Sequence, residues 1–207
     1  MAIQFKKIRQ YLARNTRLSI CFEDGYYHDY LMISDIPAET INYWIGTESK
    51  RENIRLSLIA AVELAERDDI NCIYFSLSRE KQELLEMLNE KQRAIMNFVH
   101  IIDTPGLAVE DVLEKLTEQL ETDGRRNFCV IIDELPLLST REKVRSRIEE
   151  NCVVLKKLNV FSSQYDGVEF VCNVLVSKHA SSHKEALNEL REYAPIEYFN
   201  GRLTFIE

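Results

Sequence analysis

The segment Phe128-Cys-Val-Ile-Ile-Asp-Glu134 joins five apolar residues to two carboxylates, and the segments around it decide the fold class. An uninterrupted apolar run of this length is typical of a strand buried on both faces of a sheet. From Glu39 onward, short apolar runs alternate with longer amphipathic stretches, which is the order of a parallel sheet with crossover helices. The sequence therefore predicts an α/β fold, with strands near 41–45, 72–77, 99–102, 128–132, 170–176 and 202–206 and helices near 52–67, 79–96, 109–122, 141–158 and 183–193.

The first 38 residues have a different character. Apolar side chains at near-helical spacing predict a short amphipathic helix over 3–13, carried by Ile3, Phe5, Ile8 and Leu12. Two β-rich runs, 17–23 and 26–33, flank Asp24-Gly25, a dipeptide that favours the turn of a two-residue hairpin. Pro37 then interrupts the pattern. We therefore expect a helix-plus-hairpin appendage over residues 1–38 and an α/β domain over residues 39–207.

Composition excludes several classes of protein. The 207 residues are 45% hydrophobic and 29% charged, which excludes a largely disordered or collagen-like chain. No stretch approaches the roughly 20 apolar residues of a membrane helix, and the N-terminus lacks a signal-peptide pattern. The cysteines are too dispersed for a disulfide framework or a zinc-ligand pattern. We therefore expect a cytoplasmic protein that does not enter a membrane.

Asp133 and Glu134 are the first candidates for chemistry. Carboxylates at the carboxyl end of a buried parallel strand hold Mg²⁺ and polarise water in P-loop NTPases. In the alternative interpretation, Asp133 caps the next turn and Glu134 is solvated. This stretch alone does not choose between them.

Four segments in order resemble one family. They are Ile101–Val112, Cys129–Ser139, Cys72–Leu77 with the Arg-Glu-Lys of residues 79–81, and Arg145–Val160. Together they are similar to the C-terminal RecA-like ATPase domain of DnaB-type replicative DNA helicases, over about residues 40–180. The resemblance implies a RecA-like P-loop NTPase core and a function associated with DNA replication.

The sequence departs from that family in the phosphate-binding loop. The family loop ends in Gly-Lys-Thr, in which backbone N–H groups and the lysine hold phosphates and the hydroxyl holds Mg²⁺. Here the candidate nucleotide-binding residues are Gly46, Ser49, Lys50, Glu52 and Asn53. Glu52 stands in the lysine position and Asn53 in the threonine position, while Lys50 comes two residues early. A carboxylate facing the β- and γ-phosphates would repel them.

Two further positions differ from the family. Ser78 replaces the glutamate that acts on the attacking water, and Ser177 stands where the family has glutamine. Asp133 and Glu134 remain as residual catalytic candidates, with Asp133 binding Mg²⁺ only if a nucleotide binds. We therefore expect a pseudo-ATPase without a cofactor. The alternatives are a helicase component that binds ATP and Mg²⁺ at an atypical site, and an interaction module that uses the core as a scaffold.

Partners are predicted from charge and from the family resemblance. The formal net charge of −8 gives no overall attraction for phosphates, so weak or no DNA binding is expected from the chain alone. Arg141, Lys143 and Arg145 are candidates to contact a DNA backbone, the alternative being solvated helix and loop faces. A loop that cannot hold bridging ATP predicts a monomer or small oligomer. We expect a protein partner, with replication proteins as candidates, and residues 1–38 as the docking element.

Overall fold

The computed structural model describes residues 18–21, 27–28, 41–46, 50–65, 71–122, 127–165, 167–176 and 183–206. The strands are β1 (Leu18–Cys21), β2 (Tyr27–His28), β3 (Ile41–Gly46), β4 (Asn71–Phe75), β5 (His100–Ile102), β6 (Phe128–Ile132), β7 (Val168–Leu175) and β8 (Arg202–Ile206). The helices are α2 (Lys50–Ala65), α3 (Lys81–Glu86), α4 (Glu90–Met96), α5 (Val109–Thr122), α6 (Arg147–Gln164) and α7 (His183–Tyr193), with 3₁₀ turns η2 (Leu135–Leu137) and η3 (Ile196–Tyr198). None of these helices is both long and apolar enough to cross a membrane.

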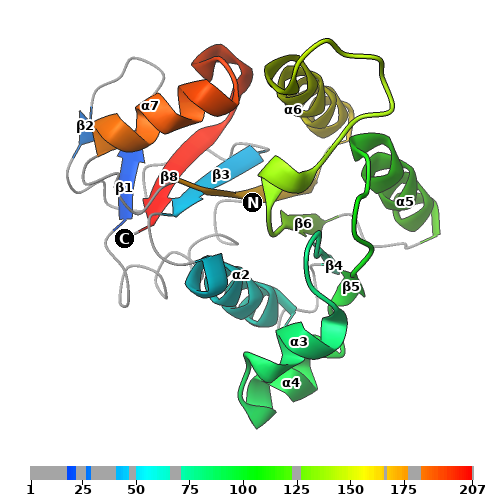
Figure 1. Ribbon diagram of the computed structural model, residues 1–207. Helices are drawn as coiled ribbons and strands as arrows, with labels where there is room; N and C mark the ends of the chain where they lie inside the picture. Colours follow the sequence, from blue (N-terminus) through cyan, green and yellow to red (C-terminus); the bar gives the residue numbers. More distant parts are fainter. Residues whose placement is uncertain are drawn as a thin grey trace.

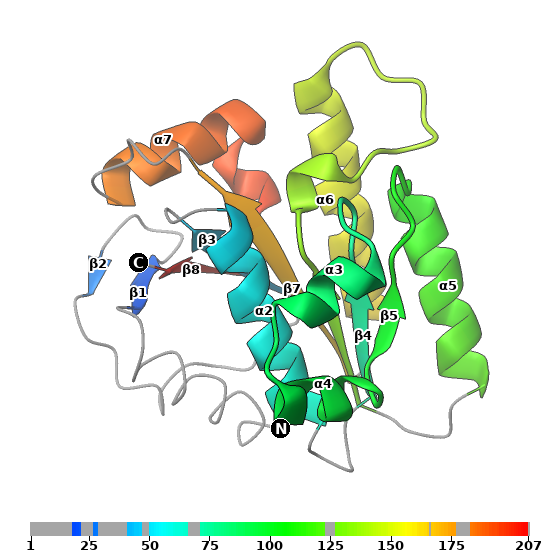
Figure 2. The same ribbon diagram turned by 60° about the horizontal axis from the view of Figure 1, so that its bottom comes forward.

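The strands form one sheet in the order β2-β1-β8-β3-β7-β6-β4-β5. Every neighbouring pair from β8 to β5 is parallel, and β1 pairs antiparallel with both β2 and β8. Helices cover both faces: α2, α3 and α4 lie on one side and α5, α6 and α7 on the other (Figures 1 and 2). The predicted α/β fold with a mostly parallel sheet is confirmed.

Burial on both faces explains the apolar run at the centre of the sheet. In β6, Phe128, Val130 and Ile132 enter the core beneath α5, α6 and α7. Cys129 and Ile131 enter the core beneath α2 and α4. Successive side chains of a strand point to opposite faces, so a central strand covered twice has no polar position. The predicted strands of the α/β domain all form for this reason, with ends that differ by one to three residues.

The N-terminal predictions are only partly covered by the described residues. β1 and β2 pair through Ile20 with His28 and Cys21 with Tyr27, as the Asp24-Gly25 dipeptide predicted. β1 also pairs with β8, so this hairpin continues the main sheet. The predicted helix over 3–13 and the boundary near residue 38 lie outside the described residues and stay predictions.

The single helix predicted over 79–96 is wrong. The structure has two short helices, and Asn89 begins the second. The Asn89 side chain accepts a hydrogen bond from the Gln92 N–H at 2.9 Å, and the Gln92 side chain accepts one from the Asn89 N–H at 3.0 Å. This reciprocal cap satisfies N–H groups that an uninterrupted helix would bond to its own carbonyls, and so favours a new start.

The predicted start of the helix over 141–158 is also wrong. α6 begins at Arg147, where the Ser146 hydroxyl accepts a hydrogen bond from the Glu149 N–H at 3.1 Å. The preceding residues are held elsewhere, because the Arg141 N–H donates to Glu110 of α5 at 3.1 Å. A segment tied to another helix in this way cannot continue α6 toward its N-terminus.

Replacing Asn89 by alanine should lower the free energy of unfolding by about 1 kcal/mol, the usual cost of losing an N-cap side chain. Urea denaturation measures the change. Asn97→Ala is the control, since Asn97 is exposed at the other end of α4. Equal losses in the two variants would contradict a capping role for Asn89.

Candidate functional site

The candidate site lies where the carboxyl ends of neighbouring parallel strands meet the start of α2. Ligands of parallel α/β sheets bind at this edge, because loops there leave the strands in the same direction. Of the predicted residues, the structure brings together Lys50, Asp133 and Glu134. Ser76 and Ser78, which follow β4, join them.

Asp133 is 1% exposed and binds the two strands beside it together. One carboxylate oxygen accepts a hydrogen bond from the Ser76 hydroxyl at 2.9 Å, and the other accepts one from the Leu77 N–H at 3.0 Å. The Asp133 N–H donates to the Phe75 carbonyl at 3.1 Å. Burial raises the pKa of the Asp133 carboxyl to about 6, although the hydrogen bonds from Leu77 and Ser76 lower it. Both oxygens therefore have partners within the chain.

Glu134 connects the same strand end to α2. One of its carboxylate oxygens lies 2.8 Å from Lys50 Nζ, and the other accepts a hydrogen bond from the Ser78 hydroxyl. The Glu134 side chain is 14% exposed, whereas that of Lys50 is 43% exposed. Lys50 is the first residue of α2, so its ammonium group spans from the helix start to the end of β6.

Asn53 fills the space above the end of β3. A Cβ atom on Gly46 would lie 1.9 Å from Asn53 Nδ2, so only glycine fits there while this side chain keeps its position. Asn53 is 7% exposed, and its Oδ1 has no hydrogen-bond partner among the described residues. The amide therefore occupies the start of the predicted phosphate loop.

Other predicted site residues are placed incompletely or elsewhere. Ser49 lies outside the described residues, and Glu52 is placed only by its backbone in the first turn of α2. Lys143 and Arg145 are exposed before α6. The Arg141 guanidinium pairs with Asp111 and with Glu114 of α5, so its charge is already matched by carboxylates.

The sequence interpretation missed the role of the two serines after β4. Ser78 was noted as a departure from the family, but nothing predicted that it donates to Glu134. The signal was present in Ser76-Leu-Ser78, since hydroxyls at a strand end next to a carboxylate-bearing strand can bond across to it. Within the described residues, no three His, Cys, Asp or Glu side chains gather to hold a metal ion.

Comparison with known proteins supports the fold. No family model matches the chain, and no curated protein is significantly similar. Among solved structures, the ATPase domain of a DnaB-like helicase superposes with a TM-score of 0.65 and 17% identity, over 80% of this chain and 68% of that one. The chain has a RecA-like fold.

Two further RecA-like structures agree. A DnaB-like replicative helicase, described with its interactions with primase, matches with a TM-score of 0.57 and 15% identity over 70% of this chain and 41% of that one. A KaiC-like protein from Pyrococcus horikoshii matches with a TM-score of 0.50 and 15% identity, over 72% and 67%. The predicted likeness to DnaB-type ATPase domains is confirmed for the fold, which is all that such identities show.

Replacing Asp133 by asparagine should stabilise the protein at neutral pH. The folded pKa of Asp133 lies above its unfolded value of 3.8, so its favourable contribution is full below about pH 4 and is lost as pH rises through 6. The neutral amide can still accept from Leu77 and donate to Ser76. We expect Asp133→Asn to raise the free energy of unfolding by about 2 kcal/mol at pH 7.5 and by little at pH 4. Urea denaturation at both pH values measures this, and a variant less stable than wild type at pH 7.5 would contradict it.

Glu110→Gln provides the opposite control. Desolvation raises the pKa of Glu110, but hydrogen bonds from Thr140, Lys157 and Arg141 outweigh it and lower the pKa to about 2. The stability from this carboxylate is therefore present above about pH 4.5 and is lost as pH falls toward 2. The glutamine variant should be less stable than wild type at pH 7.5, and this deficit should shrink in acid.

Proposed function

We propose that this chain is a catalytically degenerate relative of DnaB-type helicase ATPase domains, acting as a non-enzymatic adaptor or regulator in the replication of a chromosome, phage or mobile element. The observation that carries the proposal is the 2.8 Å ion pair between Lys50 and Glu134. It commits the cation at the start of α2 to the chain's own carboxylate. The association with replication is an analogy from fold, supported by the likeness to the two DnaB-like helicase structures.

The residues present do not fit ATP and Mg²⁺ bound as in a P-loop. Such a site needs a lysine directed at the β- and γ-phosphates, a hydroxyl on Mg²⁺ and a free backbone cradle. Here Lys50 faces Glu134, Asn53 replaces the hydroxyl residue, and the Asn53 side chain packs over Gly46. We therefore derive no step of phosphoryl transfer for this chain.

The second candidate function is a helicase component with an atypical nucleotide site. It is favoured by the position of Lys50, which begins α2 and is 43% exposed. Released from Glu134, its ammonium group would be available to a phosphate at this helix start. Asp133 would then be the remaining ligand for Mg²⁺, at the cost of its hydrogen bonds to Ser76 and Leu77.

The purified chain should show no Mg²⁺-dependent binding of ATP in calorimetric titration, because its cations and carboxylates pair with one another. Lys50→Ala and Asp133→Ala are tested beside it and should be equally silent. Micromolar binding by the wild type that is lost in both variants would favour the second candidate function.

Binding to single-stranded DNA should be weaker than about 1 μM at physiological salt and should weaken further as salt rises. Arg141 is held by acidic residues, which leaves Lys143 and Arg145 as the exposed cations of the predicted contact. Fluorescence anisotropy measures the affinity. Lys143→Ala with Arg145→Ala should reduce any binding more than Lys156→Ala on α6, and tight, salt-resistant binding would contradict this prediction.

The partner class we propose is a replication protein. The DnaB-like helicase of similar fold is described with its interactions with primase, which makes proteins of the replication machinery reasonable candidates. We also propose that the chain acts in the cytoplasm as a monomer or small oligomer.

A further inference from the structure

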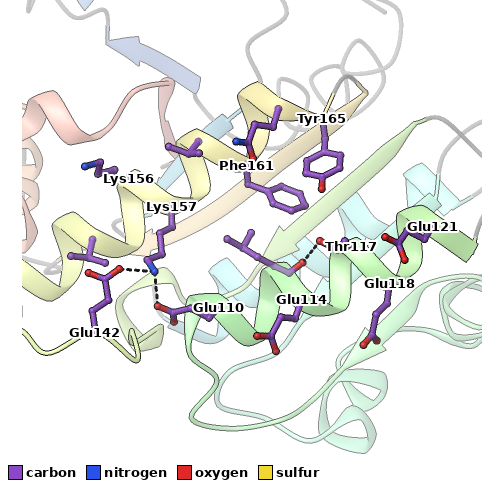
Figure 3. Close-up of a pocket in the computed structure, with 14 residues that line it drawn as sticks. Glu110, Glu114, Thr117, Glu118, Glu121, Glu142, Lys156, Lys157, Phe161 and Tyr165 are labelled. Carbon is purple, nitrogen blue, oxygen red and sulfur yellow. Dashed lines mark hydrogen bonds and ion pairs between the residues drawn. The ribbon is translucent and has the colours of Figure 1, made fainter.

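A groove of about 790 Å³ runs between α5 and α6, apart from the strand-end site (Figure 3). Its floor is apolar and is formed by Leu113 of α5 with Val153, Val160, Phe161 and Tyr165 beside it. The rings of Phe161 and Tyr165 stack with their centroids 4.4 Å apart, and the Val160 side chain is 46% exposed. Apolar surface in a concave site is typical of a place where another side chain is received.

The rim of this groove is strongly acidic. Five glutamates and two lysines line it. Four of the glutamates follow one another at helical spacing along α5, and they are Glu110, Glu114, Glu118 and Glu121. The groove therefore presents an apolar floor beside a continuous negative stripe.

The two ends of the stripe differ in how their charge is balanced. At one end, Lys157 Nζ lies 2.9 Å from Glu110 and 2.7 Å from Glu142 (Figure 3). Arg141 pairs with Glu114 at 2.9 Å. At the other end, Glu118 and Glu121 make no ion pair with any residue that the structure describes. A cationic partner would therefore gain most from that end.

We propose that this groove binds the N-terminal segment, residues 3–17, of a second copy of the chain. The segment has the complementary chemistry: an apolar series at near-helical spacing with cations between its members. Its cations are Lys6, Lys7, Arg9, Arg14 and Arg17, and no acidic residue occurs before Glu23. In a chain of net charge −8, this concentration of positive charge matches the acidic rim.

The sizes also agree. The ten residues from Ile3 to Leu12 would span about 15 Å as a helix, and the 14 residues of α5 span about 21 Å. The apolar side chains at 5, 8 and 12 could then rest on the groove floor while Lys6 and Lys7 approach Glu118 and Glu121.

A second copy is the occupant because of where the segment enters the sheet. Residue 17 leads directly into β1, which lies beyond β8 near one edge. α5 lies at the other side of the molecule, beyond α7 and α6 (Figures 1 and 2). The contact is therefore head-to-tail, with the segment of one copy on the groove of the next, and it requires no nucleotide.

Charge exchange in the full chain tests this inference. One variant carries Glu118→Arg and Glu121→Arg, a second carries Lys6→Glu and Lys7→Glu, and a third carries all four changes. Sedimentation velocity at low and high salt measures self-association. We expect wild type to associate in a concentration- and salt-dependent manner, each double variant to associate at least about tenfold more weakly, and the fourfold variant to recover.

Mixing the two double variants separates a contact between copies from one within a copy. The acidic segment of one variant should bind the basic groove of the other, so the mixture should associate where neither variant does alone. Glu86→Arg with Glu192→Arg, two exposed acids outside the groove, is the control and should leave association unchanged. A wild type that stays monomeric, a fourfold variant that does not recover, or a silent mixture would overturn the inference.

Discussion

The carboxyl group of Asp133 is buried where β6 ends, and a buried carboxylate is stable only with hydrogen-bond donors around it. The donors are the Ser76 hydroxyl and the Leu77 N–H, so the end of β6 is fixed against the end of β4. This contact sets the direction of the next residue, Glu134, toward the start of α2. There Lys50 completes the arrangement, and the strand-end edge of the sheet is bound together by the chain's own side chains.

That arrangement separates fold from function. In parallel α/β sheets, the strand-end edge is where ligands usually bind, because helix starts and loop N–H groups converge there. In this chain the groups that would meet a phosphate instead pair with each other, which supports a scaffold more than a catalyst. The apolar surface open to a partner lies on α5 and α6, on the opposite helical layer from α2. A RecA-like domain with these two features is suited to holding proteins together.

Sequence patterns predicted the sheet well because its central strands are buried on both faces and have continuous apolar runs. They failed where a single side chain decides a boundary. Asn89 starts a new helix within a stretch that has helical periodicity throughout, and Glu110 draws Arg141 away from α6 across 31 positions of sequence. The candidate residues Lys50, Asp133 and Glu134 were found from sequence by position and type. Their partners, Ser76 and Ser78, depend on contacts between strands about 57 positions apart, which no local pattern contains.

A double-mutant cycle on Lys50 and Glu134 tests the central claim most directly. Lys50→Met, Glu134→Gln and the combined variant are compared by urea denaturation at pH 7.5, with and without MgATP. We predict a coupling free energy of about 0.5 to 1 kcal/mol between the two side chains, unchanged by millimolar MgATP. A coupling of zero, or one that disappears when MgATP is added, would show that Lys50 is free to serve a nucleotide and would contradict the account.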